Sequence, residues 1–126
     1  MQEGNTMLKL TIEGVHASVD ADLEKYAQKK IGGLEKYIPR HARQSAHAEV
    51  ILKKEASKDK NKFTCEITVY LPHEVLNSKE TTQHLYAAID VASAKTHHQL
   101  TKYKDEYGSP RLHRRIINRF RTNETL

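Results

Sequence analysis

Residues 82–107 read TQHLYAAIDVASAKTHHQLTKYKDEY, a stretch that contains neither glycine nor proline. Apolar or small side chains recur along it at helical spacing: Leu85, Ile89, Ala92, Leu100, Tyr103 and Tyr107. At ~100° per residue these positions occupy about a third of a helix circumference, so we expect this face to pack against the rest of the protein. We expect Thr81 or Thr82 to cap the helix.

A row of basic side chains follows another flank of the same predicted helix. Lys95, His98 and Lys102 are spaced i, i+3 and i+7, which stacks them on one side. For this helix alone, a solvated face is the simpler interpretation of the row, and a binding surface is the alternative.

Length, charge and cysteine content limit the classes of protein to which the chain can belong. Its 126 residues suit one domain with one core, and its formal net charge of +5 favours an anionic partner such as nucleic acid. The single cysteine, Cys65, excludes an intrachain disulfide and fits a reducing cytosol. No apolar run approaches the ~18 residues that a membrane span requires, so we expect no membrane association. Residues 1–6 do not resemble a signal peptide, and we expect them to be disordered.

Alternation of apolar and polar residues predicts four strands, over residues 7–13, 46–54, 63–71 and 75–79. The charged residues 55–62 are expected to form the loop of a hairpin. The residues expected to face inward are Leu8, Leu10, Ile12, Ala48, Val50, Leu52, Phe63, Cys65, Ile67, Val69 and Leu71. Those expected to face water are Lys9, Thr11, Glu49, Lys53, Thr64, Glu66, Thr68 and Tyr70.

A second helix is predicted between the first two strands, over residues 21–37, with Asp20 as its N-cap. The glycine pair at 32–33 is unfavourable inside a helix and marks a kink, an early end or a close approach to a partner backbone. Pro39 ends the element, and residues 40–45 are expected to be a polar, basic connection. The predicted packed face consists of Leu23, Tyr26, Ala27, Leu34, Tyr37 and Ile38.

The order of these elements is β-α-β-β-β-α. Both helices have one apolar face, so we predict an α+β fold: a two-layer sandwich in which two helices pack on one face of a four-stranded sheet, over residues 7–107. Residues 108–126 form a basic tail whose segment RLHRRIINRFR contains no acid. Two interpretations of this segment stay open at this point: a helix, and a segment that folds on contact with a partner.

Residue patterns typical of enzymes are missing from the sequence. It contains no Gly-rich phosphate loop, and its eight histidines lack the spacing of a metal site. His97 and His98 are adjacent, so on a helix they point ~100° apart and cannot chelate one ion. We therefore expect no enzymatic activity, no cofactor, no metal site and no small-molecule substrate.

Basic residues on the two predicted helices suggest a nucleic-acid surface. Lys25, Lys29 and Lys36 lie within ~40° of one another on the first helix. If the helices pack side by side, this row and the row on the last helix can border one groove, with Lys30 and Lys104 at its edges. Two cationic ridges a helix width apart match phosphate backbones, and the lack of an aromatic array indicates recognition of shape and backbone. Tyr26, Tyr37 and Tyr86 are able to stack on a base, although packing is the simpler role for each.

The order of elements, the motif LEKY at 34–37 and the pattern HLYAAID…AKTHHQLTKYKDE in the last helix resemble the ribosome hibernation promoting factor family. This family includes the ribosome-associated inhibitor called protein Y and the sigma-54 modulation proteins, and the resemblance covers about residues 8–106. It implies a cytoplasmic translation inhibitor, monomeric off the ribosome, that binds the rRNA of the small ribosomal subunit at the decoding region. There it would block the tRNA and mRNA sites of idle ribosomes.

The resemblance also implies which residues contact rRNA. The family has an arginine at the position of His98 and a basic residue at the position of Gly33, while Tyr37 and Tyr86 match aromatic positions. With the basic residues on the helices and the start of the tail, the expected rRNA-binding set is Lys25, Lys29, Lys30, Lys36, Tyr86, Lys95, His98, Lys102, Lys104, Arg111, Arg114 and Arg115.

The C-terminal residues depart from the family pattern. Long members carry a second domain that pairs two ribosomes, for which we expect no room here, and the inhibitor type ends in an acidic tail. We expect the basic tail to bind rRNA near the domain. Two alternatives to a hibernation factor remain: a general structured-RNA-binding or ribosome-assembly module, and a protein-binding regulator whose tail docks on a partner.

Overall fold

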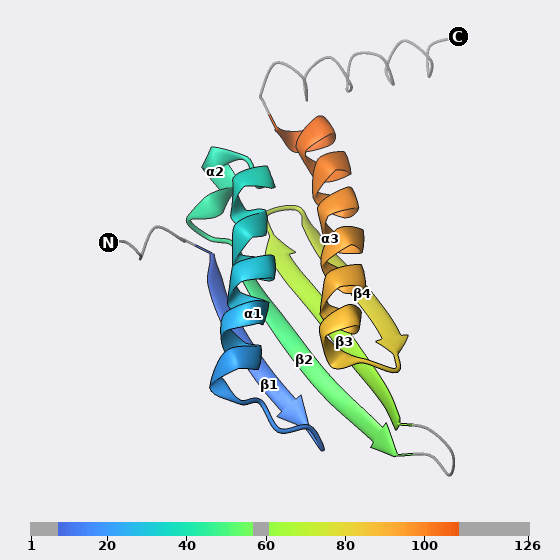
Figure 1. Ribbon diagram of the computed structural model, residues 1–126. Helices are drawn as coiled ribbons and strands as arrows, with labels where there is room; N and C mark the ends of the chain where they lie inside the picture. Colours follow the sequence, from blue (N-terminus) through green and yellow to red (C-terminus); the bar gives the residue numbers. More distant parts are fainter. Residues whose placement is uncertain (1–7, 57–60, 109–126) are drawn as a thin grey trace, which may run out of the picture.

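Four strands form one mixed sheet, and the helices cover one of its faces (Figure 1). The structure is a computed structural model of the chain, and it describes residues 8–56 and 61–108. The strands β1 (Lys9–Val15), β2 (His47–Ala56), β3 (Asn61–Leu71) and β4 (Glu74–Thr82) lie side by side in sequence order. β1 is parallel to β2, and the other neighbours are antiparallel. The predicted α+β sandwich of order β-α-β-β-β-α is confirmed.

The parallel pairing of β1 with β2 explains why a helix lies between them in the sequence. Parallel neighbours cannot be joined by a tight turn, so the chain must cross over the sheet. The crossover consists of α1 (Ala21–Gly32), the 3-10 helix η2 (Gly33–Tyr37) and the short helix α2 (Arg40–Arg43). It lies on the same face of the sheet as α3 (Leu85–Tyr107), so that α1 and α3 run side by side (Figure 1).

The core lies between the sheet and these two helices. The predicted inward faces of β2 and β3 are confirmed apart from Phe63, which is only half-buried at the start of β3, since Val50, Leu52 and Ile67 are at most 1% exposed. Thr64, expected to face water, is buried instead, and its hydroxyl pairs at 2.8 Å with that of Thr81, its partner across β3 and β4. The helices contribute these fully buried side chains: Ala27, Ile31, Ala88, Ile89, Ala92 and Leu100.

The structure changes the predicted path of the crossover. The glycine pair marks an early end, because the α-helix stops at Gly32 and a 3-10 helix continues to Tyr37. The predicted N-cap is confirmed, as Asp20 Oδ1 accepts a hydrogen bond of 2.8 Å from the Leu23 amide. Residues 40–45 were expected to be a plain connection, but α2 forms there, and the Arg43 Nε donates to the carbonyl of residue 38 at 2.8 Å.

Three other expectations about segment ends are wrong. The loop predicted over residues 55–62 is shorter, because Glu55 and Ala56 pair with residues 62 and 61 and extend the hairpin. β4 is longer than residues 75–79, since pairing with β3 reaches Thr82. Neither predicted threonine caps α3, because His84 holds the N-cap position. The Thr82 hydroxyl instead accepts a hydrogen bond of 3.1 Å from the His84 amide, in the turn that precedes the helix. The predictions for residues 1–6 and for the tail beyond Gly108 lie outside the described residues.

Two glycines give a matched test of this packing. A Cβ added at Gly14 would clash with the Ala17 carbonyl oxygen and lie 2.9 Å from Val19 Cγ2, whereas one added at Gly33 would meet no atom within 4 Å. We therefore expect Gly14→Ala to lower the free energy of unfolding by ~1–3 kcal/mol. Gly33, whose φ of −65° suits any residue, should tolerate alanine and gain ~0.4–1 kcal/mol. Urea unfolding followed by circular dichroism measures both, and equal effects of the two substitutions would contradict the packing described.

Candidate nucleic-acid interface

A hollow of about 410 Å³ lies between the helices on the surface away from the sheet. We call it the helix groove. Its charged lining consists of three lysines and one carboxylate, so its formal charge is 3 − 1 = +2. The residues that line it are Lys29, Lys30, Gly33, Leu34, Lys36, Tyr37, Asp90, Ser93, Ala94 and His97.

Contacts that join α1 to α3 involve Asp90 and Lys30 of the groove lining. The Tyr26 hydroxyl donates to Asp90 Oδ1 at 2.5 Å, and the Lys30 ammonium lies 3.5 Å from the same carboxylate oxygen. The Tyr26 ring meets the Tyr86 ring edge-on, with centroids 4.8 Å apart. The hydrogen bond to Asp90 is the main cause that raises the pKa of Tyr26 above its ordinary value, with burial and the negative charge of Asp90 adding to it. Asp90 is thus already engaged by α1.

Aromatic rings stack farther along the helix groove. The Tyr37 and His97 rings are stacked with centroids 3.9 Å apart, and the Lys36 ammonium lies 5.3 Å from the Tyr37 centroid. This arrangement joins η2 to α3 and leaves Lys36 exposed at the rim. His97 was not among the predicted site residues. Helical spacing places it on the same flank of α3 as Asp90, two turns earlier, but the sequence did not show that this flank faces α1.

The basic row of α1 occupies the rim of the helix groove much as expected. Lys29 and Lys36 line it, and both are exposed. Lys30 also lines it but is paired with Asp90, while Lys25 is exposed on α1 outside the lining. Within the described residues, Lys25, Lys29 and Lys36 form no ion pair, so their charges are free for a partner.

The basic row of α3 does not border the helix groove, which corrects the prediction of two facing ridges. The Lys95 ammonium lies 2.6 Å from Glu80 Oε1 and 3.2 Å from the Lys79 carbonyl oxygen, both on β4. Lys102 lines a different hollow beside β4, together with Glu74. The reason is angular: residues 95 and 97 differ by ~200° around a helix, so they face opposite sides.

The remaining predicted residues on α3 are in water. His98 and Lys104 are exposed, and Tyr86 is 44% exposed while packing on α1. Arg111, Arg114 and Arg115 lie outside the described residues. Whether any of the predicted side chains contacts rRNA stays a prediction.

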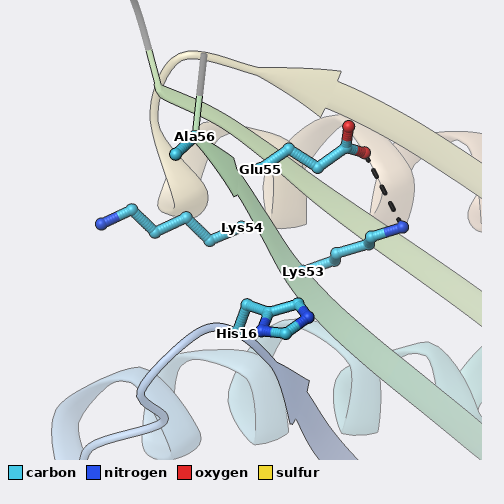
Figure 2. Close-up of a pocket in the computed structure, with 5 residues that line it drawn as sticks. All are labelled: His16, Lys53, Lys54, Glu55 and Ala56. Atoms are coloured by element: carbon cyan, nitrogen blue, oxygen red, sulfur yellow. Dashed lines mark ion pairs between the residues drawn. The ribbon is translucent and has the colours of Figure 1, made fainter. Parts of the chain in front are cut away.

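Another hollow, of about 510 Å³, lies at the C-terminal ends of β1 and β2 and is lined by His16 and residues 53–56. Figure 2 shows the Lys53 side chain reaching toward Glu55, with which it forms an ion pair of 3.8 Å, and Lys54 extending away from them. Exposed pairs of this kind contribute little free energy. The hollow brings together no nucleophile with a base, so it does not suggest a catalytic site.

Neither a metal-binding cluster nor a membrane-spanning helix is present in the described residues. No three side chains of His, Cys, Asp or Glu in residues 8–56 and 61–108 gather closely enough to hold a metal ion. No helix in the described part of the chain has the combination of length and apolar character needed to cross a bilayer.

Residues 10–107 match the family described as sigma 54 modulation protein / S30EA ribosomal protein. The chain belongs to this family. The resemblance inferred from the last helix and the order of elements is therefore confirmed. The match covers every described strand and helix except the first residue of β1.

Two curated relatives are named ribosome hibernation promotion factor. The one from Picosynechococcus sp. is 29% identical over 107 residues, which are 84% of this chain and 54% of the relative. The one from Staphylococcus aureus is 32% identical over 98 residues, which are 78% and 49% of the two chains. The chain thus spans about half the length of these relatives.

Two solved structures have the same fold as this chain. The N-terminal domain of Thermus thermophilus Protein Y is 27% identical, with a TM-score of 0.63 over 76% of this chain and 97% of that domain. A ribosomal subunit interface protein from Coxiella burnetii, 22% identical, has a TM-score of 0.61 over 77% of this chain and 98% of its own. The second likeness concerns the fold alone.

The contact between Tyr26 and Asp90 predicts a pH dependence of stability. Folding raises the pKa of this phenol from 10.0, so its contribution is fully present below that pH and is lost as the pH rises through the raised value. We expect the free energy of unfolding to fall more steeply with pH above ~10 in the unaltered chain than in Tyr26→Phe. Urea unfolding across this pH range measures the difference, and parallel curves for the two proteins would contradict the contact.

Proposed function

We propose that this chain is a ribosome hibernation factor that binds the small ribosomal subunit through its helical layer and keeps idle ribosomes inactive. Its bound position would be the decoding region, where it would block the tRNA and mRNA sites. Membership of the S30EA family and the names of the curated relatives support a ribosomal role. The helix groove is the observation that favours the helical layer as the binding surface, because Lys29, Lys36 and His97 line one hollow there.

The charges on the helical layer differ in kind from those on the sheet face that points away from the helices, which we call the open sheet face. There, polar groups satisfy one another: the Tyr70 hydroxyl donates to Glu49 at 2.8 Å, and the Asn77 amide donates to Glu66 at 3.0 Å. Lys53 likewise pairs with Glu55. A polyanion gains little from a surface whose charges are already balanced, so the helical layer is the better candidate for RNA.

Binding of this kind requires no reaction. Lysine ammoniums neutralise phosphates and release counterions, which supplies affinity without reading the sequence of bases. Inhibition then follows from occupancy, since a bound domain and an RNA ligand cannot share one site. The proposal locates the chain in the cytoplasm, as a monomer when off the ribosome.

Charge reversal at the groove tests the proposal. We expect Lys29→Glu combined with Lys36→Glu to lower the affinity for small subunits at least tenfold and to reduce the slope of log affinity against log salt by ~1–2. The matched control is Lys9→Glu combined with Lys62→Glu, two exposed lysines on the open sheet face. Cosedimentation at several salt concentrations measures both variants. Equal losses for the two, or none for the first, would place the RNA contact elsewhere.

Competition separates hibernation from a general RNA-binding or assembly role. A hibernation factor at the decoding region should be displaced from small subunits by mRNA together with tRNA. A protein that remains bound in their presence occupies another site, and the assembly alternative would then be favoured.

A further inference from the structure

The two outer strands of the sheet, β1 and β4, are protected to different degrees (Figure 1). An outer strand has a row of backbone groups without a strand partner, and such a row can pair with another chain. On β4, the Lys95 ammonium donates to the Lys79 carbonyl at 3.2 Å, and the Gln99 amide donates to the Asn77 carbonyl at 2.9 Å. In the part of the chain that the structure describes, no side chain bonds to the backbone of β1 in this way. The edge at β1 is therefore the less protected one.

The apolar side chains of β1 are also incompletely buried. Leu10 and Ile12 pack against the core, but both are only half-buried. Their neighbours on β2, Ala48 and Val50, are each 1% exposed. Because burial of the remaining apolar surface is favourable, a further strand beside β1 would complete this layer.

The charges of β1 lie on its other face. Lys9 and Glu13 are both exposed, and within residues 8–56 and 61–108 neither of them forms an ion pair. Side chains alternate along a strand, so these two charges share a face with Thr11, which lies midway between them. A partner strand that offers an acid beside Lys9 and a base beside Glu13 would match this face.

The sequence of β1 is itself such a partner. Residues 9–13 read KLTIE, with opposite charges at equal distances from Thr11. An antiparallel copy of the strand, centred on Thr11, would place Lys9 of each copy opposite Glu13 of the other. The same register would place Leu10 of each copy opposite Ile12 of the other. A two-fold axis produces both matches twice, as an interface between identical chains requires.

Other antiparallel registers of two copies lack this match. Centring the pair on Leu10 would place Lys9 opposite Thr11, and centring it on Ile12 would place Lys9 opposite Val15. A shift of one strand by a single residue would bring apolar side chains opposite charged ones on the wrong face. The charges of β1 therefore select one register.

We propose that two copies of this chain pair antiparallel through β1, with Lys9 of each copy opposite Glu13 of the other, so that their sheets become one continuous sheet. Two short strands make a small interface, so we expect a weak dimer that forms at high protein concentration. The inference goes beyond the proposed function, and it makes the monomer proposed there the state at low concentration.

Charge reversal tests the partner and the register together. Lys9→Glu alone, or Glu13→Lys alone, replaces both opposite-charge pairs of the dimer by like-charge pairs. We expect each to raise the dissociation constant of the dimer at least ~tenfold. An equimolar mixture of the two variants restores both opposite-charge pairs between unlike copies, so it should form a heterodimer about as stable as the dimer of the unaltered chain. The matched control, Lys62→Glu, reverses an exposed lysine on β3 and should leave the dimer unchanged.

Sedimentation equilibrium of the full chain, at concentrations up to about 1 mM, measures the dissociation constants. Nuclear magnetic resonance then locates the interface. In isotope-labelled Lys9→Glu, the amide signals of residues 9–13 should shift when unlabelled Glu13→Lys is added and stay in place when unlabelled Lys9→Glu is added. Circular dichroism checks that each variant is folded.

Three results would overturn the proposal: an unaltered chain that stays monomeric over this range, a dimer that survives both single reversals, or a mixture that associates no better than either variant alone. Association that Lys95→Met changes and Lys9→Glu does not would place the contact at β4 and overturn it as well. Cosedimentation with small subunits tests the proposed function independently, at concentrations where the chain is monomeric. Its failure would leave the pairing through β1 intact.

Discussion

The rotation of α3 about its own axis decides which chemistry each surface of this protein displays. The buried stripe that includes Ile89, Ala92 and Leu100 lies against the sheet, and Tyr103 anchors the end of the helix by donating to the Pro72 carbonyl at 2.7 Å. Any substantial rotation would bring these side chains into water, at ~1.5–3 kcal/mol for each large one. Apolar packing therefore determines which side chains of α3 face α1 and which face β4.

The connection from β1 to β2 provides the second wall of the groove. Because these strands are parallel, the intervening chain must return across the sheet, and it does so on the face that α3 already covers. Fully buried Ala27 on α1, and contacts such as that between Tyr26 and Asp90, keep the two helices close. The helix groove is thus a consequence of strand order, and its basic rim comes from residues that core packing leaves exposed.

Sequence patterns predicted the layers well because they depend on simple periods. Alternation located all four strands, and 3.6-residue spacing located the packed faces of both long helices. The pattern failed where pairing extends past a change in composition: charged Glu55 was assigned to a loop, although strand pairing carries it into the hairpin. The N-cap of α3 was predicted wrongly, because the Thr82 hydroxyl accepts from the amide of His84 in the turn before the helix and not from an amide inside the helix.

The candidate site was harder to predict, because a helical wheel gives angles within one helix but not between two. It correctly grouped Lys95 with Lys102, yet it could not reveal that their neighbour is β4. For the same reason Ser93 and His97 were not recognised as groove residues. Their significance depends on which side α1 occupies, and that follows from tertiary packing alone.

The most direct test of the account is an electron cryo-microscopy reconstruction of this chain bound to the small ribosomal subunit. The account predicts that α1 and α3 face rRNA, with Lys29 and Lys36 beside phosphates and the open sheet face turned away from the RNA. A complex in which the open sheet face contacts rRNA, while the helix groove faces solvent, would contradict it.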